Sequence, residues 1–157
     1  MKITKIKIVL SAIIFLSVTG FAGIAVADSS FLFVSPTGLT KTVGDTFSVS
    51  VGIDASGNKV CVAEGTLVFN NLTCQSITVA DDVTPQSSPT CSKTYFLVGV
   101  PGCTTANKVL FTVSLRAGNA GAASVSFTGV DVIGEGASLG SASTSGNYTI
   151  NAVWTLI

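Results

Sequence analysis

Apolar and polar residues alternate with a period of two along most of the chain after residue 30. The pattern is clearest in the stretch VGDTFSVSVGIDASG at 43–57, where Ser, Gly or Asp stands between successive apolar residues. Those apolar residues are Phe47, Val49, Val51 and Ile53. Because successive side chains of a β-strand point to opposite faces, the stretch predicts a strand with one face in a core and the other outside.

About nine segments of this kind follow one another, separated by Gly, Pro or Asn, and no segment shows an amphipathic helical period over a useful length. The expected strands cover residues 31–35, 46–54, 60–69, 72–79, 94–100, 109–115, 122–129, 130–134 and 146–150. Short, evenly spaced strands with turn residues between them are typical of an all-β sandwich. We therefore predict one domain, an antiparallel β-sandwich of about nine strands with jelly-roll topology.

The alternation also sorts the side chains into an interior and an exterior set. The predicted interior consists of Phe47, Val49, Val51, Ile53, Leu67, Phe69, Phe111, Val113, Leu115, Val125 and Phe127. The outward positions are mostly Ser, Thr and Gly, and hydroxyl side chains keep a β surface soluble without charge. Such a face is either an ordinary solvated surface or a docking surface, and the pattern fits both.

The first 27 residues differ from the rest of the chain. Three lysines precede a long apolar run, which ends in the small-residue signal Ala-Val-Ala at 25–27. This order is typical of a secretory signal peptide, so we predict cleavage after Ala27 and a mature domain of residues 28–157. The apolar run is also long enough to span a bilayer, so the alternative is an uncleaved anchor, which would be the only part of the chain to contact a membrane.

Charged residues are scarce: they make up 10% of the 157 residues, and there is no histidine. Without residues 1–27 the net charge is about −3, and no basic patch remains. The missing basic patch argues against nucleic acid as a partner. Low charge with abundant Ser, Thr, Gly and Val suits an extracellular β domain, so we expect a secreted protein, free or associated with the cell surface.

Four cysteines lie in the part of the chain that is expected to be exported: Cys61, Cys74, Cys91 and Cys103. An even number of cysteines in an oxidising compartment favours disulfides, with free buried thiols as the alternative. Four cysteines allow three pairings, and we favour Cys74–Cys91 with Cys61–Cys103. The segment between Cys74 and Cys91 has the composition of a long loop, which a covalent link would help to close.

The sequence offers no clear catalytic site, and we predict a protein that is not an enzyme and needs no cofactor. The missing histidine removes Ser-His-Asp and Cys-His arrangements and the usual zinc sites. Asp81 and Asp82 are neighbours in an expected loop, whereas glycosidase carboxylates face each other across a substrate. Asp54 and Asn58 join them as loop oxygens available to Ca²⁺, although ordinary turn chemistry explains all four. Glu64 is expected on an outward face, solvated or facing a partner.

Direct carbohydrate binding would use exposed planar aromatic side chains, and the amphipathic aromatics after residue 27 are Tyr95, Tyr148 and Trp154. The tyrosines lie in expected strands and the tryptophan in the C-terminal tail, so the three form no row that tracks a polysaccharide. Asn71 and Asn147 each begin an N-x-T sequence. Each is a glycosylation acceptor in a cell that uses this motif, and otherwise an ordinary turn or strand-start asparagine.

The order and spacing of several segments together resemble the cohesin domain family. The segments are SPTGLTKTVGDTFSVSVGIDASGNKV, AEGTLVFNNLTCQSITV, YFLVGVPG, KVLFTVSLRAGNAGAASVSFTGVDVI and SGNYTI, and they cover about residues 31–151. The resemblance implies a nine-stranded jelly-roll sandwich related to carbohydrate-binding modules. It also implies a non-catalytic module that binds dockerins, which are small Ca²⁺-loaded helical modules of polysaccharide-degrading enzymes.

A partner of that kind would dock on a sheet face, in extracellular polysaccharide degradation or at the cell surface. The outward residues offered for this role are Leu110, Thr112, Ser114, Ser76 and Thr78. Among these hydroxyls Leu110 would be an apolar anchor, although a single exposed leucine is also ordinary. Two alternatives remain: a carbohydrate-binding module that acts directly on polysaccharide, and a structural surface or adhesin domain with no discrete ligand.

Overall fold

The computed structural model describes residues 29–156, so the segment 1–27, expected to be a signal peptide or an anchor, lies outside the described residues. Residues 29–156 form strands and connecting turns, with no helix among them. The strands are β1 (Phe31–Ser35), β2 (Gly38–Thr42), β3 (Thr46–Asp54), β4 (Val60–Asn70), β5 (Leu72–Val79), β6 (Thr84–Ser87), β7 (Tyr95–Thr104), β8 (Lys108–Ala117), β9 (Gly121–Gly134), β10 (Ala137–Gly140), β11 (Ala142–Thr144) and β12 (Gly146–Asn151). In this part of the chain no helix is available that could cross a membrane.

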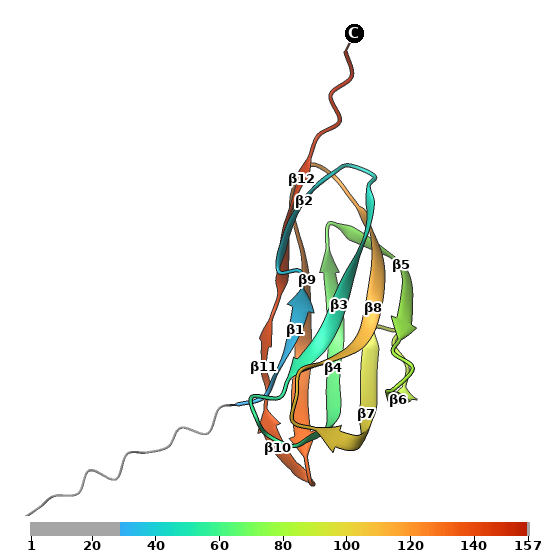
Figure 1. Cartoon of the computed structure of the whole chain (residues 1–157). Coiled ribbons are helices and arrows are strands. Elements are labelled where there is room, and N and C mark those ends of the chain that lie inside the picture. Colours follow the sequence, from blue (N-terminus) through green and yellow to red (C-terminus); the bar gives the residue numbers. More distant parts are fainter. Residues whose placement is uncertain (1–28, 157) are drawn as a thin grey trace, which may run out of the picture.

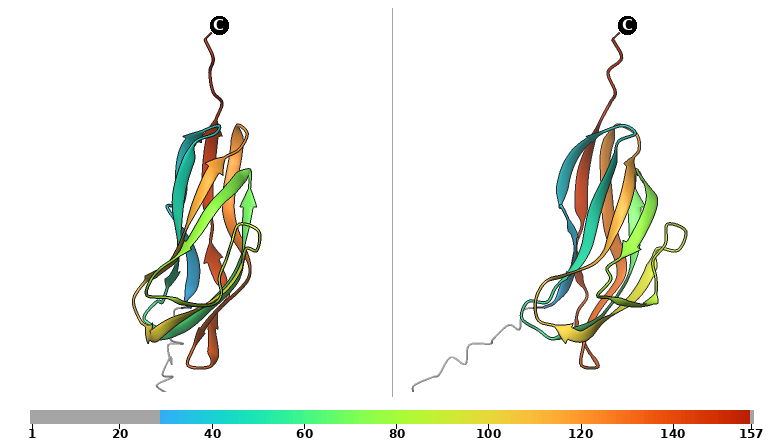
Figure 2. Two further views of the ribbon diagram at one scale, coloured as in Figure 1. Left: turned by 90° about the vertical axis from the view of Figure 1, so that its right-hand side faces the viewer. Right: turned by 45° about the vertical axis from the view of Figure 1, so that its right-hand side comes forward.

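The strands form two sheets that stack face to face as a sandwich (Figures 1 and 2). The five-stranded sheet has the order β11-β1-β3-β8-β5. The seven-stranded sheet has the order β2-β12-β9-β4-β7-β6, with β10 paired to β9. Neighbouring strands are therefore often distant in sequence, which is the long-range pairing expected of a jelly-roll sandwich.

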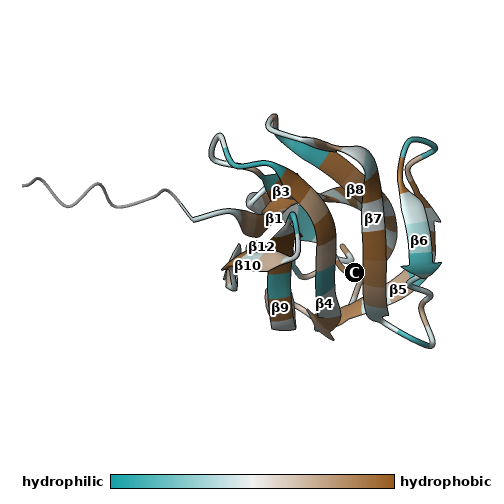
Figure 3. Cartoon of the chain, turned by 90° about the horizontal axis from the view of Figure 1, so that it is seen from below, coloured by the Kyte–Doolittle hydropathy of each residue, from teal (hydrophilic) through white to brown (hydrophobic). Residues whose placement is uncertain are grey.

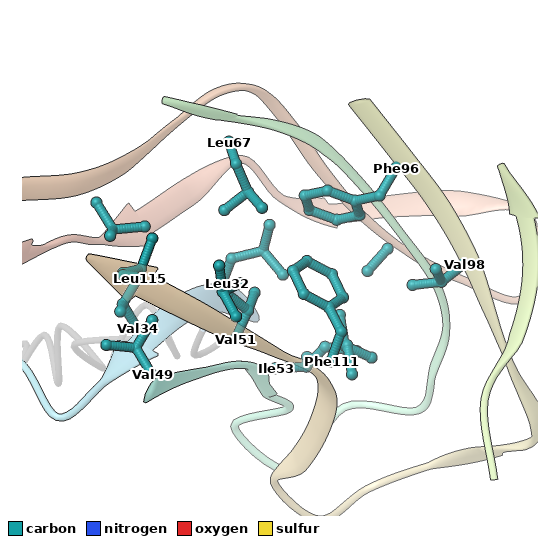
Figure 4. Packing of buried hydrophobic residues seen from close by; sticks show 14 of the residues in the cluster. Leu32, Val34, Val49, Val51, Ile53, Leu67, Phe96, Val98, Phe111 and Leu115 are labelled. Carbon is teal, nitrogen blue, oxygen red and sulfur yellow. The ribbon is translucent and has the colours of Figure 1, made fainter. Parts of the chain in front are cut away.

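The core lies between the sheets and is built from the apolar positions of the alternating pattern. Phe96 from β7 and Phe111 from β8 meet edge to face at its centre, with ring centroids 5.0 Å apart (Figure 4). Edge-to-face geometry suits the ring quadrupoles and adds to the free energy gained by burying both rings. The predicted interior is confirmed for most of its members, while Phe69 and Phe127 are partly buried at the margin of the core.

The all-β prediction is confirmed, but the structure has twelve strands where about nine were expected. The additional strands β2, β6, β10 and β11 have at most five residues, and all lie at or near the sheet edges. They carry little apolar alternation, and β6 is largely hydrophilic whereas β7 and β8 are largely hydrophobic (Figure 3). Conversely, the segments 122–129 and 130–134, expected as separate strands, form the single strand β9.

The sheets are also mixed rather than wholly antiparallel. Strand β1 pairs with β11 in parallel, and β2 pairs with β12 in parallel. Both parallel pairs join the beginning of the domain to its end, so a long connection separates the partners, as parallel pairing requires. The edge strands β2 and β11 are short and do not alternate, so the sequence gives no signal for these parallel pairs.

A β-bulge in β8 overturns the prediction that Leu110 points outward. The pairing of β3 with β8 shifts register between Val51 and Gly52. The extra residue places Leu110 and Phe111 both inside, each 0% exposed, whereas Val109 is 43% exposed. A bulge breaks the strict alternation on which the prediction rested, so Leu110 belongs to the core and is not available to a partner.

Two disulfides join the strands at separate places: Cys61 to Cys103 and Cys74 to Cys91. This is the pairing favoured on sequence grounds, and no free cysteine remains in residues 29–156. The first disulfide links the start of β4 to the end of β7 within one sheet. The second links β5, in the five-stranded sheet, to the loop that precedes β7 in the seven-stranded sheet.

Candidate functional site

The outward face of the five-stranded sheet carries two rows of hydroxyl groups. In one row Ser48 of β3 and Ser76 of β5 flank Ser114 of β8. In the next row Ser50 and Thr78 flank Thr112. We call these six residues the hydroxyl face: Ser48, Ser50, Ser76, Thr78, Thr112 and Ser114. Cross-strand Ser and Thr pairs stabilise a sheet modestly and leave donors and acceptors facing solvent.

Thr112, Ser114 and Thr78, which the sequence offered as partner contacts, therefore lie together on one face. Thr112 and Thr78 are exposed, and Ser114 is half-buried. Leu110 is buried and does not belong to this face, so the hydroxyl face lacks the apolar anchor that was expected from the sequence. The nearby exposed apolar residue is Val109, at the edge of the two rows.

The outward face of the seven-stranded sheet is different, because it gathers apolar and aromatic side chains. Val62 of β4 lies opposite Ile133 of β9, and Leu97 of β7 lies opposite Glu64 of β4. We call the following residues the apolar face: Val62, Val68, Tyr95, Leu97 and Ile133. Val68 is 40% exposed and the other four are half-buried. The alternation of residues within 60–69 and 94–100 is the sequence signal for this face, although its residues are not among the partner contacts expected from the sequence.

Hydrogen bonds hold Tyr95 of the apolar face and the polar side chains beside this face in place. Tyr95 Oη donates to Glu64 Oε1 at 3.0 Å, and Ser138 Oγ donates to Asp131 Oδ1 at 2.5 Å. Glu64 and Asp131 are directly opposite on neighbouring strands. The hydrogen bond to Glu64, with burial as a smaller cause, raises the pKa of Tyr95 above its usual value. Glu64 is thus outward, as predicted, and it is paired with a tyrosine that the sequence did not connect to it.

The acidic residues considered for catalysis or Ca²⁺ binding do not converge. Asp82 forms an ion pair with Lys108, and the hydrogen bond from that lysine holds the pKa of Asp82 below its usual value. Asp54 Oδ1 accepts hydrogen bonds from the backbone N–H and the hydroxyl of Ser56 at 2.8 and 3.2 Å, which is turn chemistry. Across residues 29–156, no three acidic or cysteine side chains are grouped so that they could hold a metal ion.

The three aromatic residues considered for sugar stacking are dispersed. Tyr148 is buried against Phe47, with ring centroids 5.4 Å apart, and its hydroxyl donates to the carbonyl of Pro36 at 3.1 Å. Burial raises the pKa of Tyr148 to about 12. Trp154 is 90% exposed in the tail that follows β12 (Figure 1). Tyr148 therefore cannot stack on a ligand, and the other two lie on separate parts of the molecule.

The two N-x-T asparagines have different surroundings. The side chain of Asn71 bridges two turns: Nδ2 donates to the carbonyls of Asn119 and Ala122 at 2.7 and 3.1 Å, and Oδ1 accepts from the Asn119 N–H at 2.8 Å. Asn71 therefore has a structural role that a glycan on Nδ2 would disrupt. Asn147 is exposed on β12, and no hydrogen bond of its side chain occurs within residues 29–156.

No protein-family model matches the sequence, and no curated protein matches it. Solved structures do match. One is the third ScaB cohesin of R. flavefaciens in complex with a group 1 dockerin, at 14% identity and a TM-score of 0.63 over 80% of this chain and 98% of that one. Another is a non-cellulosomal cohesin from the archaeon Archaeoglobus fulgidus, at 16% identity and a TM-score of 0.59 over 79% of this chain and 92% of that one.

A type I cohesin–dockerin complex from Clostridium thermocellum also matches, at 9% identity and a TM-score of 0.57 over 79% of this chain and all of that one. The match spans nearly the whole length of each of these cohesin structures. The chain therefore has a cohesin-like fold, as the sequence resemblance implied.

Proposed function

We propose that this chain is a non-catalytic binding module whose partner is a protein of the dockerin type. The observation that supports the proposal is the cohesin-like sandwich itself, because two of the similar structures are complexes with dockerins. The described residues add a reason of their own: they offer outward sheet faces suited to docking, and their acidic groups are paired or dispersed rather than assembled around a substrate.

The apolar face is the better candidate for the contact surface. The cores of protein interfaces are enriched in aromatic and apolar side chains and depleted of charge. Val62, Leu97 and Ile133 supply such a centre on neighbouring strands, and Tyr95, with its hydroxyl held by Glu64, adds a rigid aromatic side chain. Fixing a side chain before binding reduces the entropy lost on association.

The hydroxyl face is the competing surface. Thr112, Ser114 and Thr78 could donate and accept hydrogen bonds across a broad, uncharged area. Without Leu110, however, this set contains no apolar anchor, and a few buried anchors carry most of the binding energy in typical interfaces. We therefore assign the hydroxyl face second place.

The location proposed for this module is extracellular, with assembly of polysaccharide-degrading proteins or of cell-surface proteins as its context. Two disulfides support an oxidising compartment, since they persist outside the cytosol and are rare within it. The segment 1–27 would direct export, with cleavage after Ala27. Mass spectrometry of the exported protein checks this step, because cleavage leaves Asp28 as the first residue.

The experiment is capture with the immobilised oxidised protein from the secreted and surface proteins of the source organism, with and without a Ca²⁺ chelator. A captured protein is then purified and its affinity is measured by calorimetry. A dockerin-type partner predicts 1:1 binding that is lost with chelator, since dockerin folding depends on Ca²⁺. Binding to polysaccharide alone, or no binding to any protein, would instead support the carbohydrate-binding or structural alternative.

Two matched variants locate the surface. Leu97→Lys adds a positive charge to the apolar face opposite Glu64, and Thr112→Lys adds the same charge to the hydroxyl face. We expect Leu97→Lys to weaken binding more than roughly tenfold and Thr112→Lys to change it less than about twofold. The reverse order would move the proposed contact to the hydroxyl face, and equal melting temperatures of the two variants would show that both are folded.

A further inference from the structure

A shallow pocket of about 340 Å³ lies on the outside of the five-stranded sheet, along β1. It begins beside the hydroxyl face, since Ser35 of the pocket pairs with Ser50, and it lies on the opposite sheet from the apolar face. Strand β1 and its short parallel neighbour β11 lie side by side at this edge (Figure 1). The volume falls within the range of small-molecule sites, at its lower end.

Two phenylalanine rings form the apolar part of the pocket. Phe31 and Phe33 alternate with the buried residues Leu32 and Val34, so both rings point away from the core, and both are only partly buried. Neither ring belongs to the two ring pairs that stabilise the interior of residues 29–156. Large apolar rings that remain outside a complete core need another reason to be there.

The strand next to β1 is shaped to seat one of these rings. Phe33 lies opposite Gly52 of β3. A Cβ atom at residue 52 would lie 2.6 Å from Cζ of Phe33 and 2.7 Å from the carbonyl oxygen of Lys108. Glycine therefore lets the Phe33 ring lie close against β3, where it forms a firm wall of the pocket instead of a mobile side chain.

Polar groups line the rest of the pocket. Asp54 lies opposite Phe31, and Thr144 lies opposite Phe33. Asn107, just before β8, adds an amide. Within residues 29–156, hydrogen bonds to the Asp54 carboxylate use Oδ1 alone, and the exposed side chains of Asn107 and Thr144 make none. These donors and acceptors remain available to a ligand.

We propose that this pocket binds a neutral saccharide unit. A pyranose ring has an apolar face of C–H groups and a rim of hydroxyls, which matches two phenylalanine rings bordered by a carboxylate, an amide and a hydroxyl. Lys and Arg are absent from the described residues that line the pocket, and Asp54 would repel an acidic sugar. The proposed ligand is therefore an uncharged sugar rather than a uronate or a sulfated sugar.

This inference is independent of the protein-binding role, because the two sites lie on opposite sheets. One sheet would hold a protein partner while the edge of the other contacts glycan. The sugar site also differs from the aromatic set considered from the sequence, since it uses none of Tyr95, Tyr148 and Trp154. Phenylalanine has no polar tip and so does not belong to the amphipathic aromatic residues. The pairing of β1 with β3 nevertheless places Phe31 opposite the carboxylate of Asp54, with Phe33 two residues further along β1.

Affinity electrophoresis of the oxidised protein tests the proposal. The gels contain hydroxyethylcellulose, xylan, galactomannan or β-1,3-glucan as neutral polysaccharides, and polygalacturonate as the acidic one. We expect retardation by at least one neutral polymer and none by polygalacturonate. Calorimetry with a hexasaccharide of the retarding polymer then gives the affinity.

Variants connect the binding to the pocket. Phe33→Ala and Asn107→Ala each remove one kind of contact, and we expect each to lower the affinity at least roughly fivefold. Val109→Ala is the control, because this exposed residue belongs to the same sheet but not to the pocket. Leu97→Lys, on the other sheet, should leave sugar binding unchanged even where it abolishes protein binding.

Three results would each overturn the proposal: no retardation by any neutral polymer, stronger retardation by polygalacturonate, or retardation that survives both Phe33→Ala and Asn107→Ala. Asn107 lies in an exposed loop, so its variant keeps the test decisive if Phe33→Ala should unfold. Loss of sugar binding in Leu97→Lys with an unchanged melting temperature would also contradict a pocket along β1.

Discussion

The outward faces of the two sheets differ in chemistry although the inward faces are alike. Both sheets contribute regularly spaced apolar residues to one core. Outside, the five-stranded sheet presents rows of Ser and Thr, whereas the seven-stranded sheet presents Val62, Leu97 and Ile133 around a Tyr95–Glu64 hydrogen bond. A core needs only apolar volume from each sheet, so the outward residues are free to differ, and the proposed contact surface rests on that difference.

The contrast is sharpest where the hydroxyl face meets the bulge in β8. Val109 is exposed and the next residue, Leu110, is completely buried. Had the strand kept its alternation, Leu110 would have given the hydroxyl face an apolar centre comparable to that of the other sheet. One extra residue in a strand therefore decides which of the two faces resembles the core of an interface.

The largest predicted effect concerns the two disulfides, one within the seven-stranded sheet and one between the sheets. Chain-entropy estimates for the separations of 42 and 17 residues predict that removing Cys61–Cys103 costs about 4 kcal/mol and removing Cys74–Cys91 about 3 kcal/mol. Urea unfolding of the double Cys→Ser variants measures both losses. The order would be contradicted if the 74/91 variant were the less stable of the two.

The next effect tests whether Leu110 is buried and Val109 exposed in β8. Leu110→Ala empties space in the core and should lower the free energy of unfolding by about 3 kcal/mol. Val109→Ala, one residue away and exposed, should change it by less than about 0.5 kcal/mol. A larger loss for Val109→Ala than for Leu110→Ala, measured by urea unfolding, would show that β8 keeps its alternation and has no bulge at this point.

A smaller effect is expected on the outside of the five-stranded sheet. Gly52→Ala forces a methyl group against the Phe33 ring and the Lys108 carbonyl, and we expect a loss of about 2 kcal/mol. Ser50→Ala, on the same face of β3, should be nearly neutral. Thermal unfolding of the two variants compares them, and a stable Gly52→Ala protein would mean that Phe33 does not lie against β3.

The smallest effect is a pH dependence that links the sheets through Tyr148. Its pKa of about 12 in the folded state exceeds the value of about 10 expected when unfolded, so the folded protein holds the proton more tightly. The stability contributed by the neutral phenol is complete below pH 10 and is lost as the pH rises toward 12. Between about pH 9 and pH 11 the loss is about 1 kcal/mol.

The matched variant Tyr148→Phe isolates this titration, because it removes the Tyr148 hydroxyl and leaves every other titratable group the same in both proteins. The difference in free energy of unfolding between the two proteins should shrink by about 1 kcal/mol between about pH 9 and pH 11. A difference that stays constant over this range would show that the Tyr148 hydroxyl is solvated.

Much of the fold was readable from the alternation of residues, and the reason is local. Strands β1, β3 and β5 match their expected bounds, since each has alternating or apolar residues between clear turn residues. The edge strands β2, β6, β10 and β11 were not foreseen, because their pairing depends on neighbours that are distant in sequence. The same limit applies to the outward residues. Thr112 and Thr78 face outward as their alternation predicts, whereas Leu110 is buried because of a bulge that depends on the neighbouring strand.

The sequence by itself determined an all-β sandwich, its main interior residues and the resemblance to cohesins. These follow from periodicity, composition and the order of segments along the chain. Only the tertiary structure decided that Leu110 is buried, that Tyr95 binds Glu64, and that Phe31 and Phe33 border a pocket with Asp54. Each of these depends on the register between strands, and register is set by packing across the whole sheet rather than by any one segment.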